Sequence, residues 1–135
     1  MTATSCPKRT GRYAVGTGCS LDYATTQYAL HHLNDFWKLA ALQRIHAALK
    51  PGATFMLRDV YSCHPSETKE TIDAWLKWMQ EERGYSREEN ATHVREEHST
   101  FAWVMEGLLE RGGFRLQQAR YARGVYATYI CQRPN

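Results

Sequence analysis

The chain has 135 residues, a formal net charge of +3, and 43% hydrophobic and 23% charged residues. This length and composition predict one ordinary globular domain and exclude a disordered or fibrous chain. No apolar run reaches the roughly 18 residues of a membrane span, and the basic residues are scattered, so no membrane or nucleic-acid partner is expected.

The N-terminal segment predicts a loose tail rather than a targeting signal. Residues 1–12 are polar and contain Pro7 and Gly11, and no apolar core of a secretory signal follows them. We therefore expect a tail over 1–12, a single α/β domain over 13–135, and a cytoplasmic protein. In that compartment thiols stay reduced, and no C-x-x-C pair occurs. The four cysteines expected to be free are Cys6, Cys19, Cys63 and Cys131.

The stretch AVGTGCS, with Gly16 and Gly18, resembles the start of a cofactor-binding turn. Such a turn needs a strand before it, a helix after it, and an acidic residue about 20 residues later at the end of the next strand. Here the next predicted strand begins almost at once, and Asp35 opens a helix instead of ending a strand. We interpret the glycines as a turn that leads into the following strand.

The first half of the domain predicts a strand, a helix and a second strand. Tyr23–Tyr28 is expected to be a strand buried on both faces. Residues 34–50 predict a helix that Asn34 or Asp35 caps and that Pro51-Gly52 ends. A strand over 53–62 follows, and the unit should be parallel and right-handed. The apolar stripe predicted for the helix consists of Phe36, Leu39, Leu42, Ile45 and Leu49.

The second half predicts helices and then a hairpin. A helix over 66–83 ends at Gly84, and its apolar stripe is Ile72, Trp75, Leu76 and Met79. Ser86 to Glu89 form a capping box for another helical segment. The last helix, within 99–113, should direct Phe101, Val104, Met105 and Leu108 inward. Two strands with a turn near residues 122–124 complete the chain, the second running from Val125 to Cys131.

From about residue 21 to 133 this order of elements resembles the C-terminal half of class I S-adenosylmethionine-dependent methyltransferases. The matching residues are Asp22 at the start of a strand, the segment Leu30-His31-His32-Leu33, and the helix stop Leu49-Lys50-Pro51-Gly52. The resemblance implies a partial Rossmann-like α/β fold: a short mixed sheet in the family order 4-5-7-6, its last strands an antiparallel hairpin, with helices packed on it. The family's N-terminal half, which grips the methionine and ribose parts of S-adenosylmethionine, is not matched.

The resemblance also implies where ligands would bind. In the family, residues just past the fourth strand touch the cofactor, which corresponds here to Gln27, Tyr28 and Ala29; simple strand termination is the alternative. Arg58, Asp59 and Tyr61 end the next strand and would face the same substrate crevice. Arg58 and Asp59 could instead form an ordinary ion pair. Arg95 would lie near the mouth, unless it belongs to a solvated charged helix. No catalytic residue is assigned.

The histidines do not predict a metal site. His31 and His32 are adjacent, and adjacent side chains of an extended segment point in opposite directions, so we expect one to pack under the end of the sheet and the other to be exposed. His93 and His98 are five apart and share no helix face well. We therefore expect no metal ligands.

With half of the cofactor site unmatched, the chain alone is expected to be unable to bind S-adenosylmethionine or to transfer a methyl group. Two alternatives remain: a non-catalytic binding or oligomerisation module, and a half-enzyme that a separate chain completes. In the implied sheet order the Tyr23–Tyr28 strand is an edge with unpaired backbone groups, so we expect a homo-oligomer that pairs through it.

Overall fold

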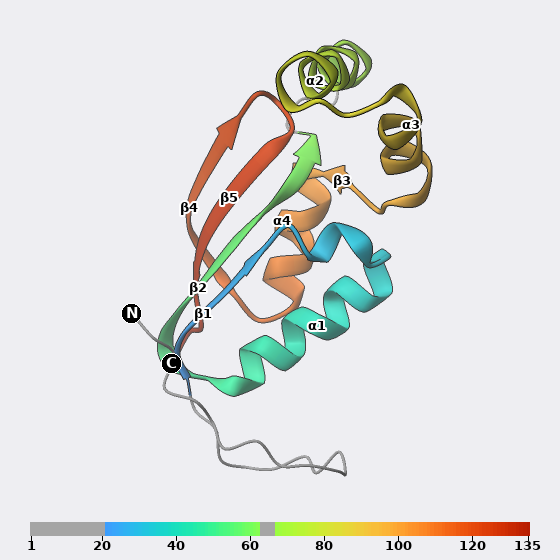
Figure 1. Cartoon of the computed structure of the whole chain (residues 1–135). Coiled ribbons are helices and arrows are strands. Elements are labelled where there is room, and N and C mark those ends of the chain that lie inside the picture. The colour runs from blue at the N-terminus through green and yellow to red at the C-terminus, as the bar shows by residue number, and fades with distance from the viewer. Residues whose placement is uncertain (1–20, 63–66) are drawn as a thin grey trace.

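The computed structural model describes residues 21–62 and 67–135. They form a mixed sheet with α1 and α4 packed against one of its faces (Figure 1). The predictions for the N-terminal tail, for the turn at Gly16 and Gly18, and for Cys6, Cys19 and Cys63 lie outside the described residues. Cys131 is free and buried, and burial raises the pKa of its thiol to about 12.

The strand order of the sheet confirms the predicted topology. The strands are β1 (Leu21–Gln27), β2 (Leu49–Ser62), β4 (Arg115–Ala122) and β5 (Tyr126–Gln132). They lie in the order β1-β2-β5-β4, with β1 parallel to β2 and the other two pairings antiparallel. A two-residue strand that the sequence did not predict, β3 (Thr100–Phe101), pairs with the end of β2.

Helix α1 (Asp35–Ala48) connects β1 to β2 and begins as predicted, because the Asn34 side chain accepts the Trp37 N–H. Its buried stripe differs from the predicted one. Phe36 is 88% exposed, whereas Lys38 is 0% exposed and lies one turn before the buried Leu42. Burial of a lysine is tolerated here because its ammonium group has polar partners, described below.

The prediction that β1 is buried on both faces is wrong, since its side chains are half-buried or exposed. Tyr23, for example, is 51% exposed. The physical reason is its place in the sheet: β1 is an edge strand, with β2 on one side and no described strand on the other. Apolar and β-branched side chains predict a strand equally well in both positions.

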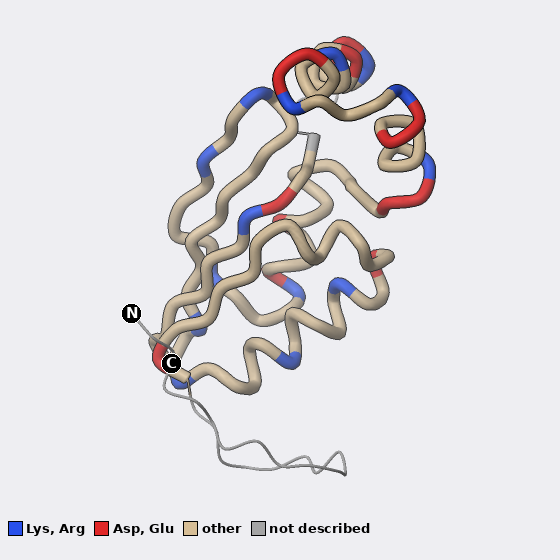
Figure 2. Tube along the Cα trace, in the orientation of Figure 1, with Lys and Arg blue, Asp and Glu red and all other residues tan. Residues whose placement is uncertain are grey.

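Helices α2 (Thr68–Arg83) and α3 (Arg87–Glu96) lie beyond the end of β2 (Figure 1). Gly84 ends α2 in the left-handed conformation, and Ser86 and Glu89 form the predicted capping box of α3. Figure 2 shows that both of these helices carry acidic as well as basic residues. In the described ranges, no helix has the length and apolar character that a bilayer crossing requires.

Helix α4 (Ala102–Arg111) packs beside α1 and leads into the hairpin of β4 and β5. Met105 is fully buried, as predicted; Leu108 is half-buried and packs against the same core, and Leu109, which was not predicted, is buried there as well. The hairpin turns at Arg123 and Gly124, both with positive φ. In β5 every second residue is buried against the helices. These elements leave the carboxyl ends of β1 and β2 pointing toward α2 and α3 (Figure 1).

Candidate functional site

A turn after β1 places two backbone amides against the carboxylate of Asp59 in β2. Tyr28 adopts a left-handed conformation with φ 51°, and its N–H donates to the Arg58 carbonyl at 2.9 Å. A short 3-10 turn, η1 (Leu30–His32), follows. Its Leu30 and His31 N–H groups donate to Asp59 Oδ2 at 2.9 and 3.2 Å. Asp59 therefore anchors the turn that carries His31 to the end of the sheet.

The imidazole of His31 lies between two carboxylates. Its Nδ1 is 2.5 Å from Asp59 Oδ1, and its Nε2 is 2.9 Å from Glu97 Oε2. His31 is 6% exposed and Asp59 is 0% exposed, so water screens their interaction poorly. The two carboxylates fix the orientation of the ring, with one nitrogen facing each of them.

The charges of the His31 imidazolium and the Asp59 carboxylate stabilise each other. Burial by itself would lower the pKa of His31, but the hydrogen bond and the charge of Asp59, together with the charge of Glu97, raise it above 6.5. Burial would likewise raise the pKa of Asp59, but the hydrogen bonds from His31 and from the Val60 N–H bring it below 3.8. Both shifts favour the imidazolium–carboxylate form.

Glu97 is the residue on which three histidines converge. It follows the last residue of α3. Besides its contact with His31, its Oε2 is 2.6 Å from His93 Nδ1, and its Oε1 is 3.9 Å from His32 Nδ1. Burial lowers the pKa of His93, although the charge of Glu97 opposes that shift. One carboxylate at the end of α3 thus joins the turn after β1 to a third histidine on α3.

Two further contacts hold the segment after α3 in place. The His98 N–H donates to the His31 carbonyl at 2.6 Å. The buried Lys38 ammonium group donates to the His98 carbonyl at 2.5 Å and lies 3.2 Å from Asp35 Oδ1. Because these bonds connect α1, η1 and the segment after α3, Glu97 is held against His31 by backbone as well as by side-chain interactions.

The histidine pair has the predicted burial, with His31 buried and the His32 side chain 57% exposed, but not the predicted backbone conformation. The expectation that His31 and His32 point in opposite directions assumed an extended segment, but both lie in η1. Their ring centroids are 4.0 Å apart. The tight turn rotates successive side chains by about 120°, compared with about 180° in a strand, so the geometric argument against a shared site does not hold.

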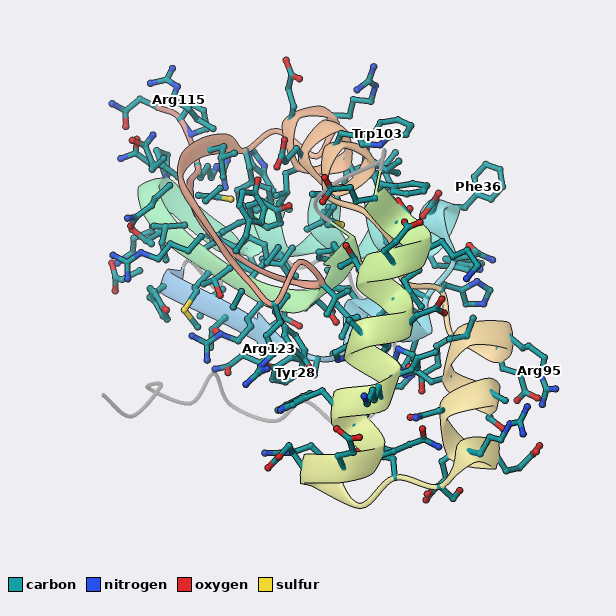
Figure 3. The ribbon with its side chains drawn as sticks, turned by 90° about the horizontal axis from the view of Figure 1, so that it is seen from above. Tyr28, Phe36, Arg95, Trp103, Arg115 and Arg123 are labelled. Atoms are coloured by element: carbon teal, nitrogen blue, oxygen red, sulfur yellow. The ribbon has the colours of Figure 1, made fainter. Side chains whose placement is uncertain are left out.

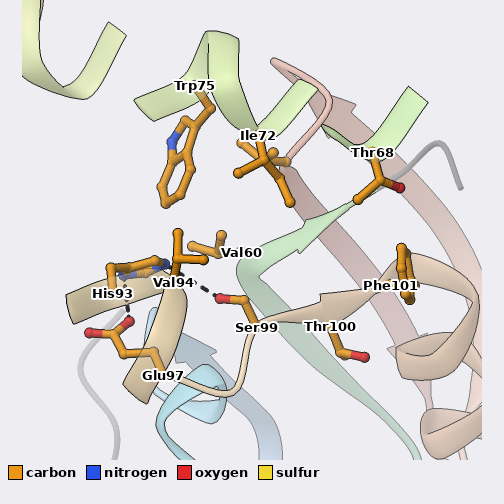
Figure 4. A pocket seen from close by; sticks show the side chains of 11 residues that line it. Val60, Thr68, Ile72, Trp75, His93, Val94, Glu97, Ser99, Thr100 and Phe101 are labelled. Carbon is orange, nitrogen blue, oxygen red and sulfur yellow. Dashed lines mark hydrogen bonds and ion pairs between the residues drawn. The ribbon is translucent and has the colours of Figure 1, made fainter. Parts of the chain in front are cut away.

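Two pockets adjoin this cluster. The larger, of about 690 Å³, is lined by His31, His32, His93 and Glu97 and by the aromatic side chains of Tyr28, Trp75, Trp78, Tyr85 and Tyr126. The smaller, of about 140 Å³, lies under α2 and has Val60, Ile72, Trp75, Val94 and Phe101 in its wall (Figure 4). Trp75, His93 and Glu97 line both pockets. Arg83, Glu88 and Glu89 also line the larger pocket. The smaller pocket is mainly apolar, and an apolar lining with a few polar groups is typical of a small-molecule site.

The predicted ligand-binding residues fall into separate places. Tyr28 lines the larger pocket, at 6.1 Å from the ring of Tyr126, whereas Gln27 ends β1 and Ala29 precedes η1. Neither of these two lines the pockets described above. What they contact in a complex stays a prediction.

The four residues expected at the substrate crevice do not meet in one place. Asp59 and Tyr61 are buried, and burial together with the charge of Asp59 raises the pKa of Tyr61. Arg58 points to the opposite face of β2, as alternation along a strand requires, and donates to Thr128 Oγ1 at 3.1 Å. Arg95 projects from the outer side of α3 and pairs with Glu88 (Figure 3).

Sequence reasoning missed His31 and Glu97 as the centre of the site. A signal was present: a histidine that closely follows one parallel strand and an aspartate near the end of the next. Such residues share one edge of the sheet. The position of Glu97 could not be found in the same way, because it depends on how α3 returns to that edge.

Comparison with solved structures shows the fold of the chain. No protein-family model and no curated protein sequence matches the chain. Solved structures do match it. Human N-acetylserotonin methyltransferase, in a complex with S-adenosylmethionine, is 19% identical with a TM-score of 0.59; the match covers 86% of this chain and 30% of that one.

Two further structures give the same result. A SAM-dependent methyltransferase from Methanosarcina mazei is 17% identical, with a TM-score of 0.60 and coverage of 90% of this chain and 63% of that one. An O-methyltransferase family protein from Burkholderia thailandensis is 15% identical, with a TM-score of 0.57 and coverage of 87% and 32%. The chain spans 41% and 31% of the first two structures matched, so the likeness is to part of each protein.

The residues described here do not by themselves form a site that fits S-adenosylmethionine. Tyr28 lines the larger pocket at the end of β1. Within residues 21–62 and 67–135, however, no strand lies beyond β1, and no glycine-rich turn leads from a strand into a helix. Backbone N–H groups of such a turn are what bind the polar end of a cofactor of this kind. These residues alone do not fit the whole cofactor.

Proposed function

Because the chain has a methyltransferase-like fold, we propose that it provides the acceptor half of an S-adenosylmethionine-dependent methyltransferase. In this proposal His31 receives the proton of an acceptor hydroxyl group. The observation that carries it is the position of His31, whose ring reaches an aromatic-lined pocket while Asp59 and Glu97 bracket both of its nitrogens. The O-methyltransferase family protein among the similar structures supports the choice of oxygen as the nucleophile.

The contacts assign a role to each group. Asp59 holds Nδ1 of His31, which leaves Nε2 as the nitrogen that takes the proton. Glu97 faces Nε2 in this structure and is also 2.6 Å from His93, so it can turn toward His93 when the acceptor hydroxyl takes its place. The step requires the neutral ring, with its Nδ1 proton held by Asp59, and therefore a pH above the raised pKa of His31. The O–H bond then breaks, the proton passes to Nε2, and Asp59 stabilises the imidazolium ion. The aromatic side chains exclude water and orient an apolar or aromatic acceptor.

S-adenosylmethionine would supply the electrophilic methyl group. We propose that the turn that binds its methionine and ribose parts comes from a polypeptide segment other than residues 21–135, for example a separate chain. A non-catalytic module remains the alternative, but it would leave a desolvated group of ionisable side chains without a use. The buried free Cys131 agrees with the reducing cytoplasm that we propose for this protein.

Calorimetric titration with S-adenosylmethionine and S-adenosylhomocysteine tests the proposal. The chain alone is expected to give no heat of binding at micromolar concentrations, because one wall of a site cannot order the ligand. Addition of a polypeptide that carries the glycine-rich turn should restore binding. Micromolar binding by the chain alone would show that the site is complete, and failure of every such mixture would favour the non-catalytic alternative.

We also propose that two copies of the chain pair through the free edge of β1. The Tyr28 N–H bonds to β2, so alternation along the strand directs the Thr25 N–H and carbonyl away from β2. Thr25 and Tyr23 are exposed on this strand. An edge of this kind, with apolar side chains on both faces, is a template for pairing with another strand.

Light scattering at micromolar concentrations should therefore give a mass of at least two chains. Thr25→Pro removes a donor on the free edge and should reduce the mass to one chain without unfolding the protein. Thr26→Pro is the matched control, since its N–H points toward β2 and its loss should destabilise the fold instead. A single-chain mass for the unchanged protein would contradict the proposal.

A further inference from the structure

We propose that His31, His32 and Glu97 form a binding site for one divalent transition-metal ion of the Zn²⁺ class. One ligand atom from each residue lies within 4.8 Å of the other two. The proposal rests on the geometry of this cluster and goes beyond the proposed methyl transfer. It also replaces the expectation of no metal ligands, which rested on an extended conformation that His31 and His32 do not adopt.

The distances between the ligand atoms suit a small ion. In a tetrahedral zinc site with bonds of about 2.0–2.2 Å, neighbouring ligand atoms are about 3.3 Å apart. Here His31 Nε2 is 2.9 Å from Glu97 Oε2, and His32 Nδ1 is 3.9 Å from Oε1. The two distances run to different oxygens of the Glu97 carboxylate, and one atom of each residue lies within 4.8 Å of the other two, so side-chain rotations are needed to bring three atoms to coordination distance.

Two further side chains, Asp59 and His93, hold the proposed metal ligands in a fixed orientation. Asp59 holds His31 Nδ1, so that Nε2 is the nitrogen presented to an ion. His93 contacts Glu97 Oε2 and steadies the carboxylate. Carboxylates and other partners of this kind fix the ring orientation of metal-binding histidines and raise their basicity.

The local charges favour a dication. Asp59 and Glu97 both face His31, while the nearest buried cation, Lys38, is directed to Asp35 and to a backbone carbonyl. Two imidazoles with one carboxylate suit Zn²⁺, Co²⁺, Ni²⁺ or Cu²⁺ better than Mg²⁺ or Ca²⁺, which prefer oxygen ligands.

Three protein ligands leave one coordination position open. The three residues line the larger pocket, so a water molecule or a small ligand can reach that position. His31 Nε2 cannot hold an ion and accept a proton at the same time. A bound ion would therefore occupy the nitrogen that methyl transfer uses.

Titration of the full chain with ZnCl₂, by calorimetry and by equilibrium dialysis, tests the proposal. His32→Ala is the informative variant, because the His32 side chain is 57% exposed and its loss should leave the fold intact. We expect one Zn²⁺ site to be lost or weakened at least about tenfold. His98→Ala is the matched control, an exposed histidine next to Glu97, and should titrate like the unchanged chain.

The same samples can be titrated with Co²⁺, whose visible absorption reports coordination geometry. The unchanged chain should show the intense bands of a four-coordinate ion, and His32→Ala should not. Equal Zn²⁺ stoichiometry and affinity in the unchanged chain and in His32→Ala would overturn the proposal, as would an equal loss in His98→Ala. Because the readout is binding, this result does not depend on whether the protein transfers methyl groups.

Discussion

Replacement of Asp59 by alanine is expected to destabilise the protein by about 3–5 kcal/mol, the usual cost of removing one partner from a buried ion pair. The change leaves the His31 imidazole without its closest carboxylate. It also removes the acceptor for the Leu30 and His31 N–H groups, which are buried with it. Urea unfolding followed by circular dichroism measures the loss.

Two further variants show how much of the lost stability comes from the charge of Asp59 and how much from replacing any aspartate. Asp59→Asn keeps the size and one acceptor oxygen, so about 1–3 kcal/mol should be lost. Asp22→Ala removes an aspartate whose side chain is 85% exposed in a pair with Lys50, and it should cost less than about 1 kcal/mol. If Asp59→Ala cost no more than Asp22→Ala, the anchoring role of Asp59 would be wrong.

The pH dependence of stability provides an independent check on the pair. The pKa of Asp59 is lowered, so its contribution is complete above its ordinary value of 3.8 and is lost as the pH falls further. The pKa of His31 is raised, so its contribution is complete below 6.5 and is lost as the pH rises through the folded value. The stability difference between the unchanged protein and Asp59→Asn should therefore be largest between pH 3.8 and 6.5.

Replacement of His31 by glutamine is expected to lower the rate of methyl transfer by about 10²–10⁴-fold in the assembly that binds S-adenosylmethionine, as loss of a general base does. Glutamine has nearly the same length and can donate and accept hydrogen bonds, but it cannot take up a proton at neutral pH. Transfer of a labelled methyl group to a panel of phenols and alcohols measures the effect.

The affinity for S-adenosylmethionine should not change in His31→Gln, because the proposed role is toward the acceptor. His98→Gln serves as the matched control, and it should keep the full rate because its side chain is exposed. An unchanged rate of methyl transfer in His31→Gln would contradict the role of His31 as the proton acceptor. A loss of cofactor affinity instead of rate would place His31 in the cofactor site.

Local sequence patterns were sufficient for most of the elements. The Ser86–Glu89 capping box, the Gly84 helix end and the β4–β5 turn are formed by residues close in sequence, and the structure contains all three. The order of the sheet followed from the resemblance to methyltransferases and was also confirmed. Predictions of burial were weaker: Phe36 belongs to a helix as expected, yet its side chain is 88% exposed.

By itself the sequence determined the succession of helices and strands, because caps, turns and apolar periodicity act over a few residues. Only the tertiary structure decided which polar groups meet. His31 follows β1, Asp59 lies in β2 and Glu97 follows α3, and their contacts exist because η1 bends toward β2 and α3 returns to the same end of the sheet. The site depends on these long-range contacts between loops and strand ends, which no local pattern encodes.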